Sequence, residues 1–298
     1  MKRRTFLKSA VWGGAALSAV PGLIGRPAAA PGPPDLAVIQ GNSPADIARA
    51  AVEALGGMKR FVSRGDVVLI KPNIGWDRTP EMAACTNPDI VRILVELSFA
   101  AGAKKVAVMD NTTNQAQRCY VRSGIQAAAR EAGAEVPFIN PRRIKKMTIG
   151  GAWLKEWDVI QDFVECDALI NVPIAKHHNL CRVTLGMKNW LGAIGDPRNR
   201  LHQRIDEASA DLAAFFKPKL TVLDAWRILI RNGPQGGRPS DTKLLKTAVA
   251  GTDAAAVEAM GAVLFDIVPA ELPLLRFAVE RNIGRIDLEK MNIEKRTL

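Results

Sequence analysis

The segment spanning residues 176–189 holds the densest group of side chains that could do chemistry. Its candidates are two lysines, two adjacent histidines and its last asparagine: Lys176, His177, His178, Lys188 and Asn189. An unperturbed imidazole titrates near neutral pH, which suits a histidine to acid–base catalysis. Neighbouring residues of an extended strand point to opposite sides, so one of the two adjacent histidines faces a site. We predict that His178 does.

Polar residues also follow several predicted strands. In open α/β sheets, ligands bind at the carboxyl ends of the strands, so these side chains should share one crevice. Asn, Asp and Thr also serve as caps and turns, whereas lysine and histidine do not favour those positions. We predict catalytic roles for His178, Lys176 and Asp110. We predict ligand-binding roles for Lys71, Asn73, Asn171, Lys188, Asn189 and Asp253.

The type of ligand follows from these charges. Lys71, Lys176 and Lys188 would act as point charges for a carboxylate or phosphate, which predicts a small anionic ligand. His178 and His202, together with Asp224 or Asp110, would form a long-range metal site. There is no Walker A loop and no Gly-x-Gly-x-x-Gly after a strand. The sequence therefore identifies no cofactor.

The elements that must position these residues alternate along the chain. Apolar runs predict strands at residues 36–39, 66–70, 105–109, 136–138, 168–172, 220–224 and 247–250. Apolar periodicity and caps predict helices at residues 43–55, 87–99, 117–132, 252–265 and 271–281. This alternation is typical of an α/β fold with a mainly parallel sheet flanked by helices in Rossmann-like layers. Residues 141–162 and 192–205 are less regular, and we expect insertions there.

Net charge and apolar content indicate which classes of ligand and location fit this chain. The chain has 298 residues and a formal net charge of +11. Five basic residues and no acidic residue lie in the first thirty positions, which leaves +6 for the remainder. This modest excess suits an anionic ligand, and no nucleic-acid-binding motif is present. Beyond the N-terminus, no apolar run is long enough to span a membrane, so we expect that part to be soluble.

The cysteines argue against a local metal cluster. Cys85, Cys119, Cys166 and Cys181 form no Cys-x-x-Cys pair, and this spacing argues strongly against a local zinc knuckle or a ferredoxin-type cluster. One or two disulfides and buried free thiols both fit the spacing, and we expect at least two of the cysteines to be buried free thiols.

The N-terminus has the pattern of an export signal. Arg3 and Arg4 precede Thr-Phe-Leu-Lys, an apolar stretch follows, and small residues end at Ala30. A twin arginine in this context is the address of the twin-arginine translocation pathway, which exports folded proteins. Proline at position 31 disfavours cleavage after Ala30, which leaves open a cut nearby or a retained anchor.

We therefore predict a twin-arginine signal peptide at residues 1–30, a linker at 31–35 and one α/β domain at 36–298, with a division into two lobes left open. The expected location is periplasmic or exported. The expected partners are the twin-arginine export machinery and a small anionic ligand, with no nucleic acid. The membrane would be contacted only through an uncleaved signal.

Taken together, the motifs resemble the family known as domain of unknown function 362. The resemblance covers residues 36–292. Its motifs are Val68-Leu69-Ile70-Lys71-Pro72-Asn73, Thr86-Asn87-Pro88, Ala101-Gly102-Ala103, Leu169-Ile170-Asn171-Val172-Pro173, Lys176, His178, Val183-Thr184-Leu185-Gly186-Met187-Lys188-Asn189, His202, Leu223-Asp224-Ala225, Asn232-Gly233-Pro234 and Gly251-Thr252-Asp253. This chain has Ile174 where the family often has lysine, and Glu258 where it tends to have aspartate.

The resemblance implies little mechanism. Many members of the family resemble iron–sulfur proteins through an added ferredoxin-like module, which this chain lacks. The family is also similar, more distantly, to the N-terminal part of nickel-pincer lactate racemases, by analogy of fold.

Three hypotheses about function result. The first is a cell-envelope protein that binds a small anionic ligand or cofactor. Catalysis by its lysine, histidine and aspartate side chains at the strand ends would make it an enzyme. The second is a non-catalytic binding or cofactor-assembly protein of the periplasm. The third is a metalloprotein or an iron–sulfur-linked redox protein.

Overall fold

The computed structural model describes residues 32–298. The predicted signal at residues 1–30 and the first linker residue lie outside these residues. Within the described part, residues 33–298 form one compact unit. None of its helices is long and apolar enough to cross a membrane.

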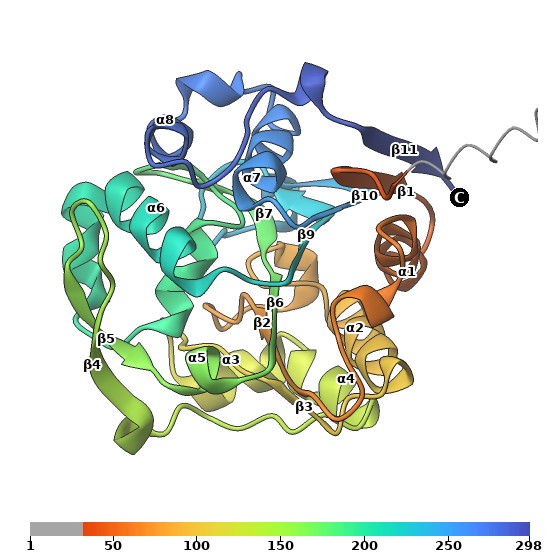
Figure 1. Ribbon diagram of the computed structural model, residues 1–298, viewed down its shortest axis with the longest axis horizontal. Helices are drawn as coiled ribbons and strands as arrows, with labels where there is room; N and C mark the ends of the chain where they lie inside the picture. The colour runs from red at the N-terminus through yellow and green to blue at the C-terminus, as the bar shows by residue number, and fades with distance from the viewer. Residues whose placement is uncertain (1–31) are drawn as a thin grey trace, which may run out of the picture. The chain divides into compact units, whose positions relative to one another are not determined.

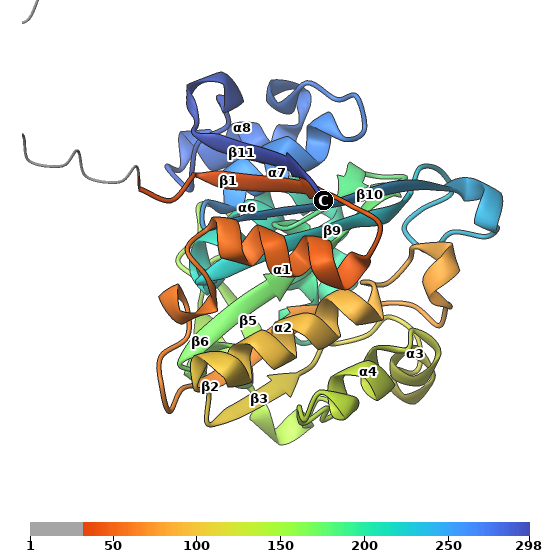
Figure 2. The same ribbon diagram turned by 90° about the vertical axis from the view of Figure 1, so that its right-hand side faces the viewer.

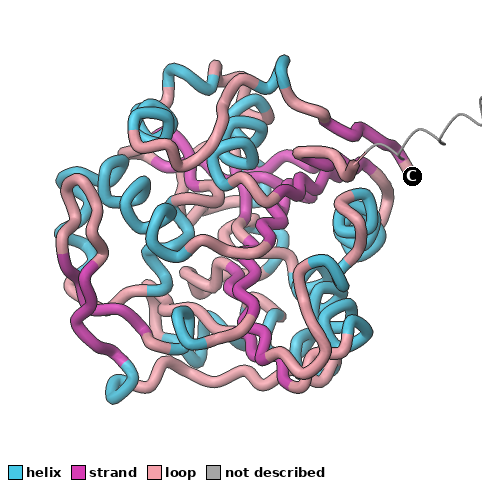
Figure 3. The backbone as a smooth tube through the Cα atoms, in the orientation of Figure 1, coloured by secondary structure: helices cyan, strands magenta, loops and turns pink. Residues whose placement is uncertain are grey.

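The unit is built on a nine-stranded sheet (Figures 1 and 3). Its main path in space is β11 (Ile293–Thr297), β1 (Leu36–Gln40), β10 (Thr242–Gly251), β9 (Leu220–Leu229), β6 (Ala168–Val172), β2 (Val67–Pro72) and β3 (Lys105–Val108). The pairs from β9 through β6 and β2 to β3 are parallel, as is β1 with β11, while β10 is antiparallel to both of its neighbours. The prediction of a mainly parallel α/β sheet is confirmed.

Two further strands extend the sheet beyond β6. After Pro173 the chain continues as β7 (Ile174–His178), which pairs in parallel with the far part of β9 and antiparallel with β8 (Arg182–Thr184). The sequence predicts a single strand here that ends at residue 172. Lys176 and His178 thus lie on a strand, two residues apart and on the same face.

Helices cover both faces of the sheet (Figures 1 and 2). One face carries α1 (Pro44–Ala54), α2 (Pro88–Ala101), α3 (Ala116–Arg122) and α4 (Ile125–Glu131). The other carries α5 (Asp162–Glu165), α6 (Ile205–Phe216), α7 (Ala254–Val263) and α8 (Pro273–Glu280). Alternate residues of β2 supply the two cores, because Val68 and Ile70 pack with the first set and Leu69 with the second. This alternation of side chains explains the uninterrupted apolar run of that strand.

Short elements connect these layers. An antiparallel pair outside the main sheet is formed by β4 (Ile144–Thr148) and β5 (Glu156–Ile160), within the expected insertion. The 3₁₀ turns are η1 (Met58–Arg60), η2 (Pro80–Met82), η3 (Pro141–Arg143), η4 (Lys188–Ala193), η5 (Arg198–Arg204), η6 (Pro239–Asp241), η7 (Pro269–Glu271) and η8 (Leu288–Lys290).

Several sequence predictions need correction. The helix expected at residues 117–132 is two helices, because Gly124 adopts a φ of +76° between them. Residues 136–138 form no strand, and only an isolated bridge between Ala107 and Glu135 lies nearby. The irregular stretch at 192–205 leads directly into α6, which the sequence analysis missed. By contrast, the expected cap of α1 is present: Ser43 accepts a hydrogen bond from the Asp46 amide at 3.2 Å.

All four cysteines are free thiols. Cys85 and Cys119 are buried, as expected for at least two of the four. Burial raises the pKa of the Cys85 thiol to about 11, so it remains protonated and unreactive at neutral pH.

Candidate functional site

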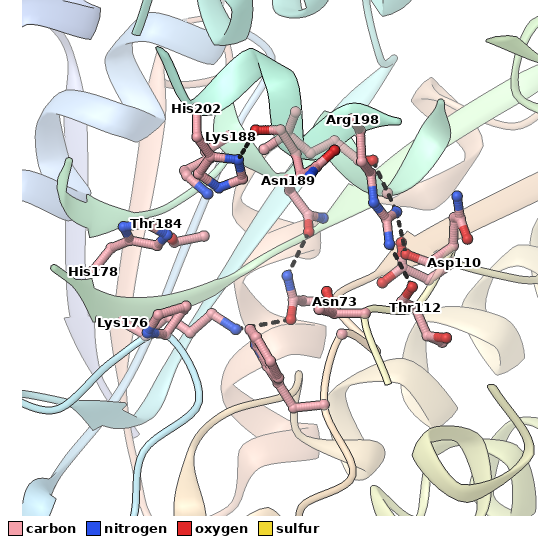
Figure 4. Close-up of a pocket in the computed structure, with 18 of the residues that line it drawn as sticks. Asn73, Asp110, Thr112, Lys176, His178, Thr184, Lys188, Asn189, Arg198 and His202 are labelled. Carbon is pink, nitrogen blue, oxygen red and sulfur yellow. Dashed lines mark hydrogen bonds between the residues drawn. The ribbon is translucent and has the colours of Figure 1, made fainter. Parts of the chain in front are cut away.

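A cavity of about 320 Å³ opens at the carboxyl ends of β2 and β3 (Figure 4). Residues after those strands form one wall, β7 forms a second, and η4 with η5 closes it. Its charged and imidazole side chains are Lys71, Asp110, Lys176, His178, Lys188, Asp196, Arg198 and His202. The structure thus brings together Lys71, Asn73, Asp110, Lys176, His178, Lys188, Asn189 and His202 from the sequence prediction.

Lys71 and Asp110 form a buried ion pair at the floor of the cavity. Lys71 Nζ lies 2.6 Å from Asp110 Oδ1 and also donates to the Pro72 carbonyl at 2.9 Å. The second Asp110 oxygen accepts from the Ile74 amide at 2.6 Å. A Cβ on Gly192 would lie 1.8 Å from Asp110 Oδ1, so only glycine fits above the pair. The two charges neutralise each other, and neither is left free for an anionic ligand.

Lys176 has a different environment. Its Nζ donates to Asn73 Oδ1 at 3.0 Å and to the Ala84 carbonyl at 2.5 Å, and no carboxylate of the described residues pairs with it within 4.0 Å. The side chain is fully buried among protein atoms, and this burial lowers the pKa of Lys176 to about 7. The cavity therefore contains an amine that can be charged or neutral near pH 7.

A chain of three asparagines fixes the acceptor that faces Lys176. Asn171 Nδ2 donates to the Gly186 carbonyl at 3.0 Å, which turns its Oδ1 toward Asn189 Nδ2 at 2.9 Å. Asn189 Oδ1 in turn accepts from Asn73 Nδ2 at 3.0 Å, which leaves Asn73 Oδ1 for Lys176. Asn171 does not line the cavity and acts by orienting the others.

Lys188 is a second amine without an acidic partner. Its side chain is almost buried, yet within residues 32–298 it makes no hydrogen bond or ion pair. Burial lowers its pKa. The residue before Lys188 is fixed by a buried carboxyl: Glu258 accepts a hydrogen bond from the Met187 amide at 2.7 Å. Glu258 thus anchors the start of η4, which carries Lys188 and Asn189 into the cavity.

Arg198 completes the basic wall, and the sequence analysis missed it. Its guanidinium donates to the carbonyls of Asn111 at 2.7 Å and Leu191 at 3.1 Å, and also to that of Thr112. Its nearest carboxylate is the exposed Asp196, 3.5 Å away. No local motif marked this arginine, because its role depends on the loop after β3 reaching η5.

The two histidines of the cavity lie face to face, with ring centroids 6.1 Å apart. His178 Nδ1 accepts from the Leu180 amide at 3.1 Å, so a neutral ring carries its proton on Nε2. His202 Nδ1 lies 3.1 Å from the Asn199 carbonyl, which requires the proton on Nδ1 and leaves Nε2 as an acceptor. Burial, then Lys188, lowers the pKa of His178 to about 3, and the pKa of His202 is lowered for the same two reasons. Both rings are therefore neutral at pH 7 in the free protein.

The predicted metal ligands do not gather. His178 and His202 line the cavity, but Asp224 does not, because its oxygens accept from the amides of Asn87 at 2.7 Å and Trp226 at 2.9 Å. In residues 32–298 no group of three or more His, Cys, Asp or Glu side chains is arranged to hold a metal ion.

Asp253 also lies away from the cavity. It caps α7, where its side chain accepts from the Ala256 amide at 3.0 Å and from the Arg285 amide at 2.9 Å. Asp224 and Asp253 are thus both held by backbone amides, which is the common role of aspartate at strand ends.

The anchor Glu258 gives a stability prediction. Burial raises the pKa of its carboxyl to about 8 from an ordinary value of 4.5. Between pH 4.5 and 8 the folded state then holds a proton that the unfolded state has released, so this group makes stability fall as pH rises. Glu258→Gln keeps an acceptor for the Met187 amide but does not titrate. We expect the variant to lose less stability than the wild type from pH 5 to pH 8 in urea unfolding. Parallel pH profiles of the two proteins would contradict this role.

The fold and the cavity together define an α/β protein with a basic site at the carboxyl edge of its parallel strands. Residues 68–263 match the family described as "Domain of unknown function (DUF362)", and the chain belongs to that family. A thylakoid-associated protein from Synechocystis sp. is 26% identical in an alignment of 254 positions that covers 79% of this chain and 74% of the relative.

Two solved structures match part of the chain at low identity. The lactate racemase apoprotein from Thermoanaerobacterium thermosaccharolyticum has a TM-score of 0.47 and 12% identity, over 76% of this chain and 56% of that one. A Thermotoga maritima protein has a TM-score of 0.42 and 10% identity, over 75% of this chain and 59% of that one. The chain thus matches less than two thirds of the length of either structure.

Proposed function

We propose that the cavity binds a small organic anion. The observation that carries this proposal is the excess of buried positive charge. Among residues 32–298, Lys176 and Lys188 have no acidic partner, and the one carboxylate that pairs with Arg198 belongs to the exposed Asp196. A buried ammonium without a counter-ion is costly, and an anion would supply that counter-ion. A water occupies about 30 Å³ of liquid, so a cavity of about 320 Å³ has room for about ten waters or a small carboxylate.

Calorimetric titration of residues 32–298 with acetate, succinate and inorganic phosphate tests this proposal. We expect at least one of these anions to bind and to raise the unfolding temperature, because a ligand that binds only the folded state stabilises it. If none binds at millimolar concentration and none changes the unfolding temperature, a site for small anions is ruled out.

Lys188→Met separates binding from stability. Removing an unpaired buried ammonium should leave the free protein at least as stable as the wild type. Loss of a charged hydrogen bond of about 1.5–3 kcal/mol should weaken anion binding about ten- to hundredfold. Lys145→Met, on the exposed side of β4, is the matched control and should change neither. Equal affinity of the two variants would remove Lys188 from the site.

Two neutral histidines add the capacity for proton transfer. His178 presents an N–H and His202 presents a lone pair to the same cavity, so one can donate to a bound anion while the other accepts from it. This pairing favours an enzyme that moves a proton on its bound anion over a carrier protein.

We further propose that the domain works outside the cytoplasmic membrane. The support is the twin arginine at Arg3 and Arg4 with the apolar stretch and small residues that follow. Replacing both arginines with lysine should retain the protein in the cytoplasm of a host that has the export machinery, as measured by cell fractionation. Lys8→Arg, which leaves the arginine pair intact, serves as the control. Unchanged export of the double variant would contradict a twin-arginine signal.

A further inference from the structure

Lys176 differs from the other lysines of the cavity in how its nitrogen is satisfied. Two oxygens, Asn73 Oδ1 and the Ala84 carbonyl, accept from Nζ, and neither is charged. A neutral primary amine has two N–H bonds and one lone pair, so these two acceptors match its two donors. Lys71, in contrast, is held as an ammonium by Asp110 at 2.6 Å.

The surroundings of Lys176 keep this amine in place. Asn73 is oriented by Asn189, which is oriented by Asn171, so its oxygen points at Nζ without rearrangement. Lys176 is among the residues that line the cavity, and Figure 4 shows its amine directed toward Asn73. The two acceptors take both N–H bonds of a neutral amine, so neither of them engages its lone pair.

We propose that Lys176 Nζ forms an imine with a small carboxylate that also carries an aldehyde or ketone group. This inference rests on the proposed anion site, with Lys188 and Arg198 holding the carboxylate. It adds a covalent step and names the class of substrate.

The step balances without a further reactant. The nitrogen lone pair attacks the carbonyl carbon, a C–N bond forms, and the electron pair of the C=O π bond moves to oxygen, which takes a proton. Nitrogen gives up one proton to leave a neutral carbinolamine. The carbinolamine then loses its hydroxyl with a second proton as water, while the nitrogen lone pair forms the C=N bond and nitrogen gives up its other proton. Amine and carbonyl thus give imine and water, with no change of oxidation state.

His178 is placed to serve the proton transfers. It lies two residues from Lys176 on β7 and on the same face, so the two Cα atoms are roughly 7 Å apart. Its Nε2–H can donate to the carbonyl oxygen, because Nδ1 is already occupied by the Leu180 amide. The pKa of about 7 for Lys176 supplies neutral amine at physiological pH, which is the form that attacks.

Reductive trapping tests the proposal. Residues 32–298 are incubated at pH 7 with glyoxylate or succinic semialdehyde and sodium cyanoborohydride, and adducts are located by peptide mass spectrometry. These probes differ in the separation of carbonyl and carboxylate. We expect labelling of Lys176 ahead of every other lysine, and suppression of that labelling by succinate, which has no carbonyl. Lys176→Arg keeps a charged donor but should lose the adduct.

If Lys176→Arg does not fold, the distribution of adducts over the lysines of the wild-type protein decides the outcome alone. Labelling that is strongest on Lys188 or on exposed lysines overturns the imine at Lys176. Stabilisation by succinate without labelling of Lys176 also overturns it, while the anion site remains. If neither succinate nor the carbonyl acids bind, the proposed function itself fails.

Discussion

Replacing Lys71 with methionine should lower the free energy of unfolding by about 3–5 kcal/mol, because it leaves a buried carboxylate without its partner. Both side chains of the Lys71–Asp110 pair are almost fully buried, with 0% and 2% exposed. Asp110 Oδ2 would keep its bond to the Ile74 amide, but Oδ1 would lose its ion-pair partner. Urea unfolding of residues 32–298 measures the change.

Two controls separate charge from packing. Lys71→Met with Asp110→Asn removes both charges and keeps an oxygen for the Ile74 amide, so it should recover part of the loss. Lys105→Met breaks an equally short pair at 2.7 Å, with Glu135, whose partners are 44% and 60% exposed. We expect Lys105→Met to lower the free energy of unfolding by about 0–1 kcal/mol. If Lys71→Met costs no more than that, the buried pair is not a source of stability.

This pair also shows how far the sequence determines the site. The apolar run at 66–70 predicts a buried strand, and Lys71 at its end is conspicuous because lysine is rarely fully buried. Its partner is not set by sheet register alone: Ile70 lies beside Val108, so continued register would set Lys71 beside Met109. Asp110 reaches Lys71 because β3 ends at Val108 and the chain then leaves the strand. Register depends on packing across the whole sheet, so a single sequence predicts that both residues follow strands but not that they neutralise each other.

Long-range packing also explains why the aspartates predicted for the site do not all lie in the cavity. Asp224 and Asp253 follow strands as Asp110 does, yet their oxygens accept from nearby backbone amides. Local sequence does not distinguish an aspartate that caps the backbone from one that pairs with a lysine on a neighbouring strand. Arg198 was missed for a related reason, since the carbonyls that hold it belong to residues 111, 112 and 191, far from it in sequence or outside any motif.

The second large effect concerns pH. Affinity for succinate should fall at least about tenfold between pH 6 and pH 9. In the free protein burial sets the pKa of Lys176 at about 7. An anion beside the ammonium raises that pKa in the complex, so binding above pH 7 requires uptake of a proton. A difference of one pKa unit between the two states corresponds to a tenfold change in affinity. Calorimetry in two buffers of different ionisation enthalpy measures the proton directly.

Some neighbouring groups titrate outside this range and others within it. Burial raises the pKa of Asp224 to about 7 and that of Glu258 to about 8, so the profile is also measured in Glu258→Gln, which should keep the pH dependence. The pKa of His178 lies near 3, below this range, and that of Cys85 lies near 11, above it. Burial lowers the pKa of Lys71, and its ion pair with Asp110 opposes that shift. Lys188 shares the cavity, and burial lowers its pKa too. Two variants separate the lysines: Lys188→Met should keep the pH dependence of succinate binding, whereas Lys176→Gln should remove it.

Trapping of glyoxylate should show the opposite trend with pH. Its initial rate requires neutral amine and should therefore rise through pH 7, while succinate affinity falls. In the wild type the two measurements should change in opposite directions around the same pKa. If Lys176→Gln removes the pH dependence of succinate binding and abolishes trapping at this position, anion binding and imine formation both depend on one nitrogen. A succinate affinity that stays constant from pH 6 to pH 9 in the wild type would show that the charge of Lys176 does not contribute to binding.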